Sequence, residues 1–392
     1  MTVTAESAAI AELHRRVISW YDANRRDLPW RDPAASPWAV MVSEFMLQQT
    51  PVSRVLPVWT QWLERWPTPA ALAAEPSGEA VRAWGRLGYP RRALRLHAAA
   101  TEIERSHRGE VPASYDDLVA LPGVGDYTAA AIAAFAYGRR QVVLDTNVRR
   151  VLGRVLGGTE FPAASVTRAE RARAAGVLPD DEATAATWSV AVMELGALVC
   201  TAASPRCADC PLAGRCAWRV AGYPAYDGPP RRAQTYDGTD RQCRGRILAV
   251  ARDAHEPVHL SRLEAAWPFV EQRERCLVSL LEDGLLVQVG PETYALPRAA
   301  TAVTASARSR TARRVVVPPL SNGRSSRNPL NALSSSTVAR AARRGAAPEA
   351  TRWSVTAAIQ TLFAAPTTLA YGSRPNRPSA AASTYTRWQP TS

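Results

Sequence analysis

The sequence of 392 residues predicts an all-α protein that carries a small winged-helix-like unit near its C-terminal end. Between residues 37 and 140, apolar residues recur at helical spacing, and short Pro/Gly breaks separate one segment from the next. Alternating strand patterns are missing from this stretch, which favours helices packed on helices. Residues 240–297 differ, because three short helical patterns there are followed by a hairpin pattern around Gly290-Pro291.

The individual elements follow from the same patterns. The first helix, 6–27, has Leu13 and Val17 on its apolar side, and Leu28-Pro29-Trp30 ends it. Later helices are expected at 147–155, 181–200, 241–252, 259–266 and 270–283. The hairpin strands are expected at 285–289 and 293–296.

These elements predict four parts of the chain. They are a helical domain at 1–222, a linker at 223–239, the winged-helix-like unit at 240–297 and a tail at 298–392. The tail is rich in Ala, Arg and Ser and lacks a sustained period, so we expect it to be disordered. Three interpretations of the tail stay open: a basic DNA tether, a solvated tail of no role, and a wrongly assigned reading frame.

The positive charge is concentrated in the tail. The chain holds 48 basic and 35 acidic residues, a net charge of +13. Residues 301–392 hold 13 Arg and one acidic residue, Glu349, so the first 300 residues hold 48 − 13 = 35 basic and 35 − 1 = 34 acidic groups. A DNA-binding surface in the folded part must therefore come from the local arrangement of charge.

All 48 basic residues are arginine. Because arginine stays protonated, it does not serve as an amine nucleophile. The composition therefore excludes a mechanism that runs through a Schiff base on a lysine side chain.

No stretch is apolar and long enough to suggest a membrane span. Met1–Ile10 has no basic segment before an apolar run, which argues against a secretory signal. We therefore expect a soluble cytoplasmic protein.

The segment Leu121-Pro122-Gly123-Val124-Gly125 lies between two helical patterns. Glycines at 123 and 125 allow a tight turn that presents backbone N–H groups at the start of the second helix. Such donors bind a phosphate without regard to base sequence. The alternative is an ordinary corner between two helices.

Four of the six cysteines fall within 17 residues, at Cys200, Cys207, Cys210 and Cys216. In a cytoplasmic chain such clustering favours a metal centre over disulfides. Four thiolates can hold a [4Fe–4S] cluster or a zinc ion, and zinc sites usually come as two Cys-x-x-Cys arms, of which only one occurs here. Cys243 and Cys276 lie outside this group and are expected to be buried thiols.

Three motifs together resemble those of a known family. The Leu-Pro-Gly-Val-Gly turn followed by 143–152 (VLDTNVRRVL) is similar to the endonuclease III superfamily of DNA glycosylases, and 38–50 (WAVMVSEFMLQQT) resembles adenine DNA glycosylases of the MutY type. The resemblance covers about residues 10–220. It implies a helix-hairpin-helix DNA glycosylase fold with two helical subdomains, a [4Fe–4S] cluster on the four cysteines, and a nucleoid-associated monomer. The implied substrate is double-stranded DNA in which adenine is mispaired with 8-oxoguanine or guanine.

The resemblance implies roles for two carboxylates. Glu44 lies in an apolar helical run, where burial would raise its pKa and suit it to protonate adenine; a solvent-facing glutamate is the alternative. Asp145 would stabilise the sugar cation, and it also stands where it would cap a helix. Asn147 would help to hold this site. Tyr127 stands where bifunctional relatives have lysine, so we expect it to hydrogen-bond near the sugar of a monofunctional enzyme.

A base must leave the duplex before it is excised, and the gap that it leaves must be filled. The resemblance implies that Gln48, Gln49 and Thr50 form one inserting loop. Leu87 and Tyr89 would form a second wedge at the opposite base. Four positions match the adenine pocket: Arg26, Leu28, Trp30 and Glu194.

The resemblance stops after residue 236, where no pattern of the Nudix-like domain typical of MutY enzymes is found. Discrimination of 8-oxoguanine would then rest on Gln49, Thr50, Leu87 and Tyr89. Two other functions stay open: a thymine/uracil mismatch glycosylase, against which Glu44 argues, and a non-catalytic DNA-binding module, against which both carboxylates argue.

Overall fold

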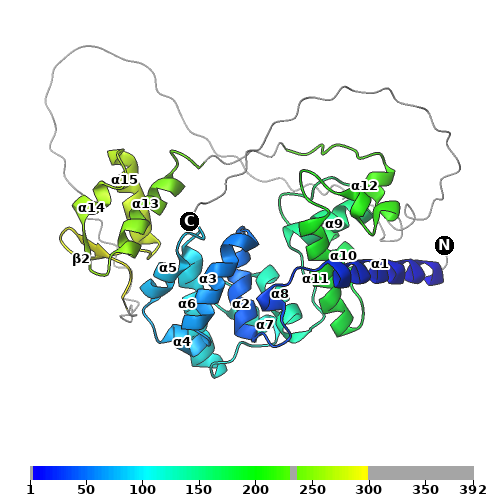
Figure 1. Ribbon diagram of the computed structural model, residues 1–392, viewed down its shortest axis with the longest axis horizontal. Helices are drawn as coiled ribbons and strands as arrows, with labels where there is room; N and C mark the ends of the chain where they lie inside the picture. The colour runs from blue at the N-terminus through cyan, green and yellow to red at the C-terminus, as the bar shows by residue number, and fades with distance from the viewer. Residues whose placement is uncertain (1–2, 230–235, 299–392) are drawn as a thin grey trace, which may run out of the picture.

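The computed structural model describes residues 3–229 and 236–298. Part of the predicted linker and residues 299–392 of the predicted tail lie outside the described residues. The described chain is mostly helical, as the sequence predicts, with one small sheet near its end (Figure 1).

The helices before residue 222 follow one another through short breaks. They are α1 Val3–Asn24, η1 Pro29–Arg31, α2 Pro37–Leu47, α3 Val52–Arg65, α4 Pro69–Ala73, α5 Ser77–Trp84, α6 Arg91–His107, α7 Tyr115–Ala120, α8 Asp126–Tyr137, α9 Thr146–Gly157, α10 Arg168–Gly176, α11 Glu182–Leu198, η2 Cys207–Asp209, η3 Ala213–Arg215 and α12 Ala217–Val220. Among the helices that the structure describes, none has the length and apolar character needed to cross a membrane.

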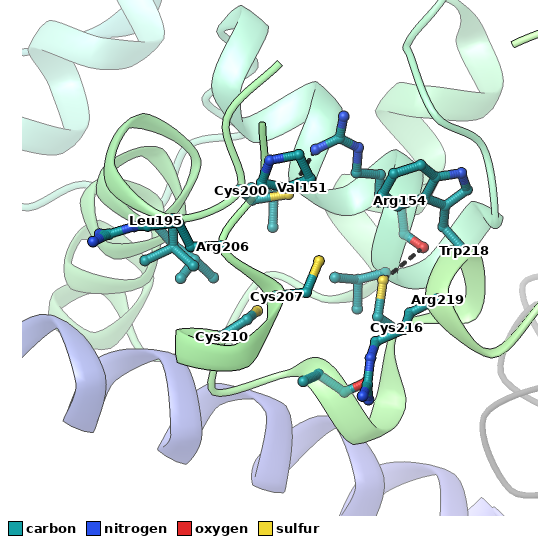
Figure 2. Close-up of a pocket in the computed structure, with 14 residues that line it drawn as sticks. Val151, Arg154, Leu195, Cys200, Arg206, Cys207, Cys210, Cys216, Trp218 and Arg219 are labelled. Atoms are coloured by element: carbon teal, nitrogen blue, oxygen red, sulfur yellow. Dashed lines mark hydrogen bonds between the residues drawn. The ribbon is translucent and has the colours of Figure 1, made fainter. Parts of the chain in front are cut away.

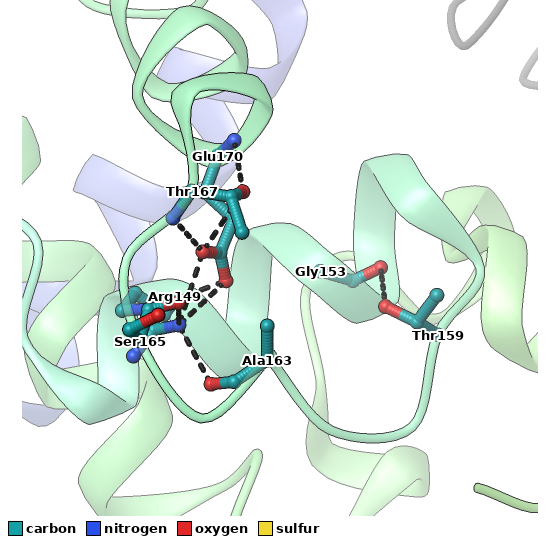
Figure 3. Close-up of polar contacts among 7 residues, drawn as sticks. All are labelled: Arg149, Gly153, Thr159, Ala163, Ser165, Thr167 and Glu170. Carbon is teal, nitrogen blue, oxygen red and sulfur yellow. Dashed lines mark hydrogen bonds and ion pairs between the residues drawn. The ribbon is translucent and has the colours of Figure 1, made fainter. Parts of the chain in front are cut away.

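Local sequence signals explain where these helices begin. At α2, Ser36 accepts a hydrogen bond from the backbone N–H of Ala39, and Pro37 occupies the first helical position. At α10, Thr167 and Glu170 form a reciprocal capping box. Arg149 of α9 pairs with Glu170 at 2.9 Å and donates to carbonyls of the connecting loop, so it secures the path from α9 to α10 (Figure 3).

Two hydrophobic cores divide the helical part into two halves. One core is built by α2–α8 and contains the edge-to-face cluster of Trp62, Trp66 and Trp84. The other is built by α1, α9, α11 and α12 around residues such as Val151 and Leu195. In Figure 1 the chain starts in the second half, crosses to the first, and returns after α8.

Helices α7 and α8 meet at the predicted glycine turn. Gly123 has a left-handed φ of +78°, and an added Cβ would lie 2.6 Å from the Cβ of Arg95 on α6, so a larger residue would not fit. Gly125 caps α8 with an ordinary φ of −105°, and nothing lies within 4 Å of a Cβ added there. Both glycines are exposed.

The last part of the described chain combines three helices with a three-stranded antiparallel sheet in the order β1-β3-β2. Its elements are α13 Asp240–Asp253, β1 Val258–His259, α14 Leu260–Glu264, α15 Val270–Glu282, β2 Val287–Gly290 and β3 Thr293–Ala295. The helices and the hairpin lie close to their predicted positions. Strand β1 was not predicted, because two residues are too short to show an alternating pattern.

This C-terminal unit packs against α5. The backbone N–H of Gly78 donates to the carbonyl of Pro297 at 2.8 Å, and Arg82 donates to the carbonyl of Ala254 at 2.9 Å. Buried residues of the unit, among them Ile247 and Leu280, belong to the same hydrophobic cluster as the tryptophans of the first half.

Candidate active site and cysteine pocket

A cavity of about 810 Å³ lies between the two helical halves. Ten of the residues predicted as site residues line it: Arg26, Leu28, Trp30, Glu44, Gln48, Gln49, Thr50, Tyr127, Asp145 and Asn147. Those that do not line it are Leu87, Tyr89, Gly123, Gly125, Glu194 and the four clustered cysteines. The fold thus brings predicted site residues that are up to about 120 positions apart in the sequence to the wall of one cavity.

Glu44 stands in the middle of α2, and it is only 6 % exposed among apolar neighbours. Its carboxylate accepts a hydrogen bond from the hydroxyl of Tyr127 at 2.9 Å. Burial raises the pKa of Glu44 to about 7; the charge of Asp145 acts in the same direction, and the Tyr127 hydrogen bond and the Arg31 charge oppose it. A carboxyl group with this pKa both gives up and takes back a proton near neutral pH.

Tyr127 begins the first turn of α8, where the glycine turn directs it towards α2. Burial, together with the charges of Glu44 and Asp145, raises the pKa of Tyr127 well above its usual range. The phenol therefore stays protonated and donates to Glu44. This hydrogen bond to the carboxylate is a placement that the sequence does not reveal.

Asp145 caps α9, as its position before the helix suggests. It accepts hydrogen bonds from the backbone N–H of Val148 at 2.6 Å and from the amide of Asn147 at 2.8 Å. Burial raises the pKa of Asp145, while these hydrogen bonds favour its charged form. Both carboxylate oxygens are thereby held in one orientation at the cavity wall.

Arg150 hydrogen-bonds to Asn147 on the helix α9, and it was not predicted from the sequence. It donates to the side-chain carbonyl of Asn147 at 2.7 Å, to the carbonyl of Gly196 at 2.8 Å and to the carbonyl of Cys200 at 2.7 Å. Two of these acceptors are backbone atoms some fifty positions away, so no local pattern reveals them. Its spacing of three from Asn147, on one face of α9, was the available signal.

A charge cluster of Glu194, Arg26 and Arg31 contributes its two arginines to the cavity wall. Glu194 of α11 is fully buried and accepts two side-chain hydrogen bonds from Arg26, at 2.8 and 2.6 Å, and one from Arg31 at 2.8 Å. Although burial alone would raise it, these arginines lower the pKa of Glu194 to about 2. Glu194 is therefore ionised, and it holds the two arginines beside Leu28 and Trp30.

Arg31 is a second residue that sequence reasoning missed. It lines the cavity, and its Nη1 atom is buried without a hydrogen-bond partner in residues 3–229 and 236–298. An unpaired buried donor of this kind is costly unless a ligand completes it. Its place in the run Arg26–Arg31, five residues after Arg26, was the only sequence signal.

Each of the two predicted wedge segments combines an exposed residue with a buried one. Gln49 is exposed and Tyr89 is 45 % exposed, and both have a left-handed backbone, with φ of +56° and +49°. Leu87 and Thr50 are buried, and Leu87 packs into the first hydrophobic core. Leu87 therefore presents its carbonyl, not its side chain, to its surroundings: Thr50 donates to that carbonyl at 3.4 Å.

The four clustered cysteines line a single pocket below α9 and α11 (Figure 2). Val151, Leu195 and Trp218 form apolar parts of its wall. Arg154 lies beside the pocket, donates to the sulfur of Cys200 at 3.4 Å and stacks over Trp218 at 4.5 Å. None of the four is in a disulfide.

The chemistry of these thiols can be compared with the two metal centres that the sequence left open. Burial raises the pKa of Cys210 to about 11 and also raises the pKa of Cys216, so ionising all four together requires nearby positive charge. Within the described ranges, no group of three or more His, Cys, Asp or Glu residues is placed to hold a metal ion. A zinc ion binds all four cysteine sulfurs itself, each at about 2.3 Å. In a four-iron cluster each cysteine sulfur binds a different iron, so the four sulfurs lie farther apart.

Comparisons with known proteins agree with this geometry. Residues 42–175 match the family model "HhH-GPD superfamily base excision DNA repair protein". An adenine DNA glycosylase of Mycobacterium tuberculosis is 54 % identical over 282 residues, covering 72 % of this chain and 92 % of the relative. A thymine-DNA glycosylase of Aeropyrum pernix is 36 % identical over 214 residues, covering 54 % and 96 %.

The solved structure of a thermostable thymine-DNA glycosylase has a similar fold, with a TM-score of 0.50 and 22 % identity; the match covers 55 % of this chain and 99 % of that one. The highest of these identities, and the near-complete coverage of that relative, decide the assignment. This chain belongs to the adenine DNA glycosylase family of the HhH-GPD superfamily.

Proposed function

We propose that this protein is a monofunctional adenine DNA glycosylase. It hydrolyses the N-glycosidic bond of adenine mispaired with 8-oxoguanine or guanine. The observation that carries the proposal is the buried Glu44, whose pKa is about 7, in one cavity with Asp145. The printed name of the 54 % identical relative supports the same activity.

In the proposed reaction, the protonated Glu44 gives its proton to N7 of the extruded adenine. The bond between N9 and C1′ breaks, its electron pair leaves with the base, and Asp145 stabilises the cationic sugar. The Glu44 carboxylate then accepts a proton from the water whose oxygen bonds to C1′. The products are free adenine and an abasic site, and Glu44 is protonated again. Tyr127 orients the Glu44 carboxylate through its hydrogen bond.

The adenine would lie against Trp30 and Leu28, with the cluster of Arg26, Arg31 and Glu194 at its edge. The unpaired Nη1 of Arg31 supplies a donor for a ring nitrogen of the base. A pyrimidine offers a different pattern of acceptors and a smaller surface, so this pocket would select for a purine.

Cleavage of the strand by a Schiff base is not part of the proposal, because the chain has no lysine. Tyr127 occupies the position where such a lysine would be needed. The abasic product should therefore stay intact until alkali is added.

Double-stranded DNA would be held chiefly through its backbone. The exposed turn at Gly123 and Gly125 presents N–H groups at the start of α8, which suits a phosphate oxygen. Gln48, Gln49 and Tyr89 would fill the space that the extruded adenine leaves. We propose that the protein acts as a monomer on the nucleoid.

We propose that the four cysteines hold a [4Fe–4S] cluster and not zinc, because they line one shared pocket and include only one Cys-x-x-Cys pair, whereas zinc sites usually have two. When bound, the cluster would cross-link the loop after α11 and neutralise the thiolates. It takes no part in the proposed proton transfers. A yellow-brown purified protein with four irons per chain would support this assignment, whereas a colourless protein loaded with zinc would overturn it.

We further propose that residues 1–222 form the catalytic domain, 223–239 a linker and 240–297 a small winged-helix-like domain that docks on α5. The C-terminal unit is too short for a Nudix-like domain. Recognition of 8-oxoguanine would then fall to the wedge, with Tyr89 at the opposite base.

The test is single-turnover base release from four labelled duplexes, A:8-oxoG, A:G, T:G and A:T, each analysed with and without alkali. The proposal expects release of adenine from the first two, no reaction at A:T, and strand cleavage only after alkali. Release confined to T:G would show a thymine glycosylase instead, as in the Aeropyrum pernix relative. Cleavage without alkali would contradict the monofunctional mechanism.

A further inference from the structure

Two residues of the proposed wedge hold a backbone conformation that L-residues rarely adopt. Gln49, after α2, has φ of +56°, and Tyr89, between α5 and α6, has φ of +49°. Both side chains are exposed, and both belong to the proposed wedge. Since neither is glycine, contacts from the rest of the fold must hold these two segments in place.

Arg92, in the first turn of α6, makes such contacts with the first segment. It is only 6 % exposed, and its Nη1 atom donates to the carbonyls of Phe45 at 2.9 Å, Met46 at 3.2 Å and Gln48 at 2.5 Å. These carbonyls lie at the C-terminal end of α2, where the helix dipole favours a positive charge. Arg92 therefore caps the helix that carries Glu44.

The other nitrogen of the same guanidinium reaches the second segment. Nη2 donates to the hydroxyl of Thr50 at 3.0 Å and to the carbonyl of Gly88 at 3.1 Å. The guanidinium carbon also lies 5.3 Å from the centre of the Tyr89 ring. One planar group thus bridges the Gln48–Thr50 segment and the Gly88–Tyr89 segment.

The partners of Arg92 in these contacts are carbonyl oxygens, a hydroxyl oxygen and ring faces. Burial lowers the pKa of Arg92 to about 10, so it stays charged at neutral pH. A fork of two nitrogens can serve both segments at once, whereas the single ammonium of lysine cannot.

We propose that Arg92 is a positioning residue that couples the two wedge segments. Through it, the contact that Tyr89 makes at the opposite base sets the position of α2 and hence of Glu44. This inference rests on the proposed glycosylase function. It assigns to Arg92 a role in the rate of excision and not in the strength of DNA binding, which the glycine turn supplies.

The primary variant is Arg92→Lys, which keeps the buried charge and removes the fork. On an A:8-oxoG duplex at saturating enzyme, we expect the single-turnover rate to fall by at least about tenfold. The dissociation constant of the duplex should change by less than about threefold. Arg105→Lys is the matched control, because Arg105 lies on the same helix, is exposed, and pairs only locally with Glu102; it should behave as the wild type.

The decisive measurement repeats Arg92→Lys in a Tyr89→Ala background. If Arg92 acts through Tyr89, the further loss should be smaller there than in the wild-type background by at least about threefold. An equal loss in both backgrounds would show a general structural role and overturn the proposal, as would an unchanged rate in Arg92→Lys.

A thermal melt of each variant checks that it folds. If Arg92→Lys does not fold, Thr50→Val takes its place, since it removes one acceptor of Arg92 and keeps the size of the side chain. The same loss of rate, reduced in the Tyr89→Ala background, is then expected. The wild-type enzyme in the same assay distinguishes failure of the proposed function from failure of the role of Arg92. An inactive wild type would refute the proposed function. An active wild type with unaffected variants would refute only the role of Arg92.

Discussion

At the scale of single residues, the proposed chemistry depends on one buried carboxyl group. Glu44 is buried on an apolar helix, and this burial raises its pKa to about 7. The charge of Arg31 opposes this rise only in part, and both Arg26 and Arg31 pair with Glu194. Glu194 thus stays charged beside the arginines, whereas Glu44 can exchange a proton near neutral pH.

This arrangement has a cost in stability that can be measured. A carboxyl group whose folded pKa lies above its unfolded value stabilises the fold below the unfolded pKa, near 4.5, and loses that contribution as pH rises through about 7. Glutamine is neutral at every pH. We therefore expect the free energy of unfolding of Glu44→Gln at about pH 8 to exceed that of the wild type by on the order of 1–3 kcal/mol.

The gap should narrow strongly at about pH 5, which is close to the unfolded pKa near 4.5, because Glu44 is then protonated in the native state and partly protonated in the unfolded chain. Urea denaturation at the two pH values measures it. A gap that is the same at both would mean that Glu44 is not a buried, titrating group.

Glu44 and Asp145 were easier to find from the sequence than the arginines that support the site. The apolar neighbours of Glu44 left both a buried and a solvent-facing position open, and the resemblance to MutY-type enzymes favoured the first. The position of Asp145 before a helix indicated a cap. The roles of Arg92 and Arg150 were not predictable, because their acceptors are mostly backbone carbonyls contributed by distant segments. Backbone carbonyls carry no residue-specific signal in a sequence.

At the scale of elements, the two glycines of the turn between α7 and α8 differ in conformation and surroundings, and we expect different roles for them. Gly123 has a left-handed φ and no room for a Cβ, whereas Gly125 has an ordinary φ and open space around it. Gly125→Ala should therefore fold normally. It should weaken binding to every duplex, matched or mispaired, by about tenfold, because the methyl group keeps a phosphate away from the N–H groups.

Fluorescence anisotropy with a matched and a mispaired duplex measures this effect, and Gly245→Ala on α13 serves as a control in ordinary surroundings. Weaker binding to one mispair alone would contradict a phosphate contact.

Helices in which apolar residues recur regularly were well predicted from the sequence, and the shortest elements were not. The hairpin of β2 and β3 was expected from its turn residues, but β1 has only two residues and forms by pairing with β3, which lies over thirty positions away. The resemblance implied two inserting segments and did not give the burial of their side chains. The structure places Leu87 in the first core.

At the scale of the whole molecule, the active-site cavity exists only because two separately packed halves meet. Its walls come from η1, α2, α8, α9 and α11, so residues far apart in sequence become neighbours. The C-terminal unit adds a third body that packs on α5, next to the segment that leads to Tyr89 (Figure 1).

The docking of this unit can be tested at Gly78. A Cβ added there would lie 2.4 Å from the carbonyl oxygen of Pro297 and 2.9 Å from the Cβ of Leu296. Gly78→Ala should push this end of the unit away from α5 and cost about 1–3 kcal/mol of stability. Hydrogen exchange of residues 285–297 should become faster, whereas unchanged exchange would contradict the docking.

The pH dependence of adenine release from an A:8-oxoG duplex, by wild type and Glu44→Gln, tests whether Glu44 is the acid of the reaction. The second-order rate constant at subsaturating enzyme reports the pKa of the free enzyme. We predict that the wild-type value falls as pH rises through about 7, by about tenfold per unit above it, because the acid form of Glu44 is lost. Glu44→Gln should bind the duplex and release no adenine, and release at the wild-type rate would contradict the account.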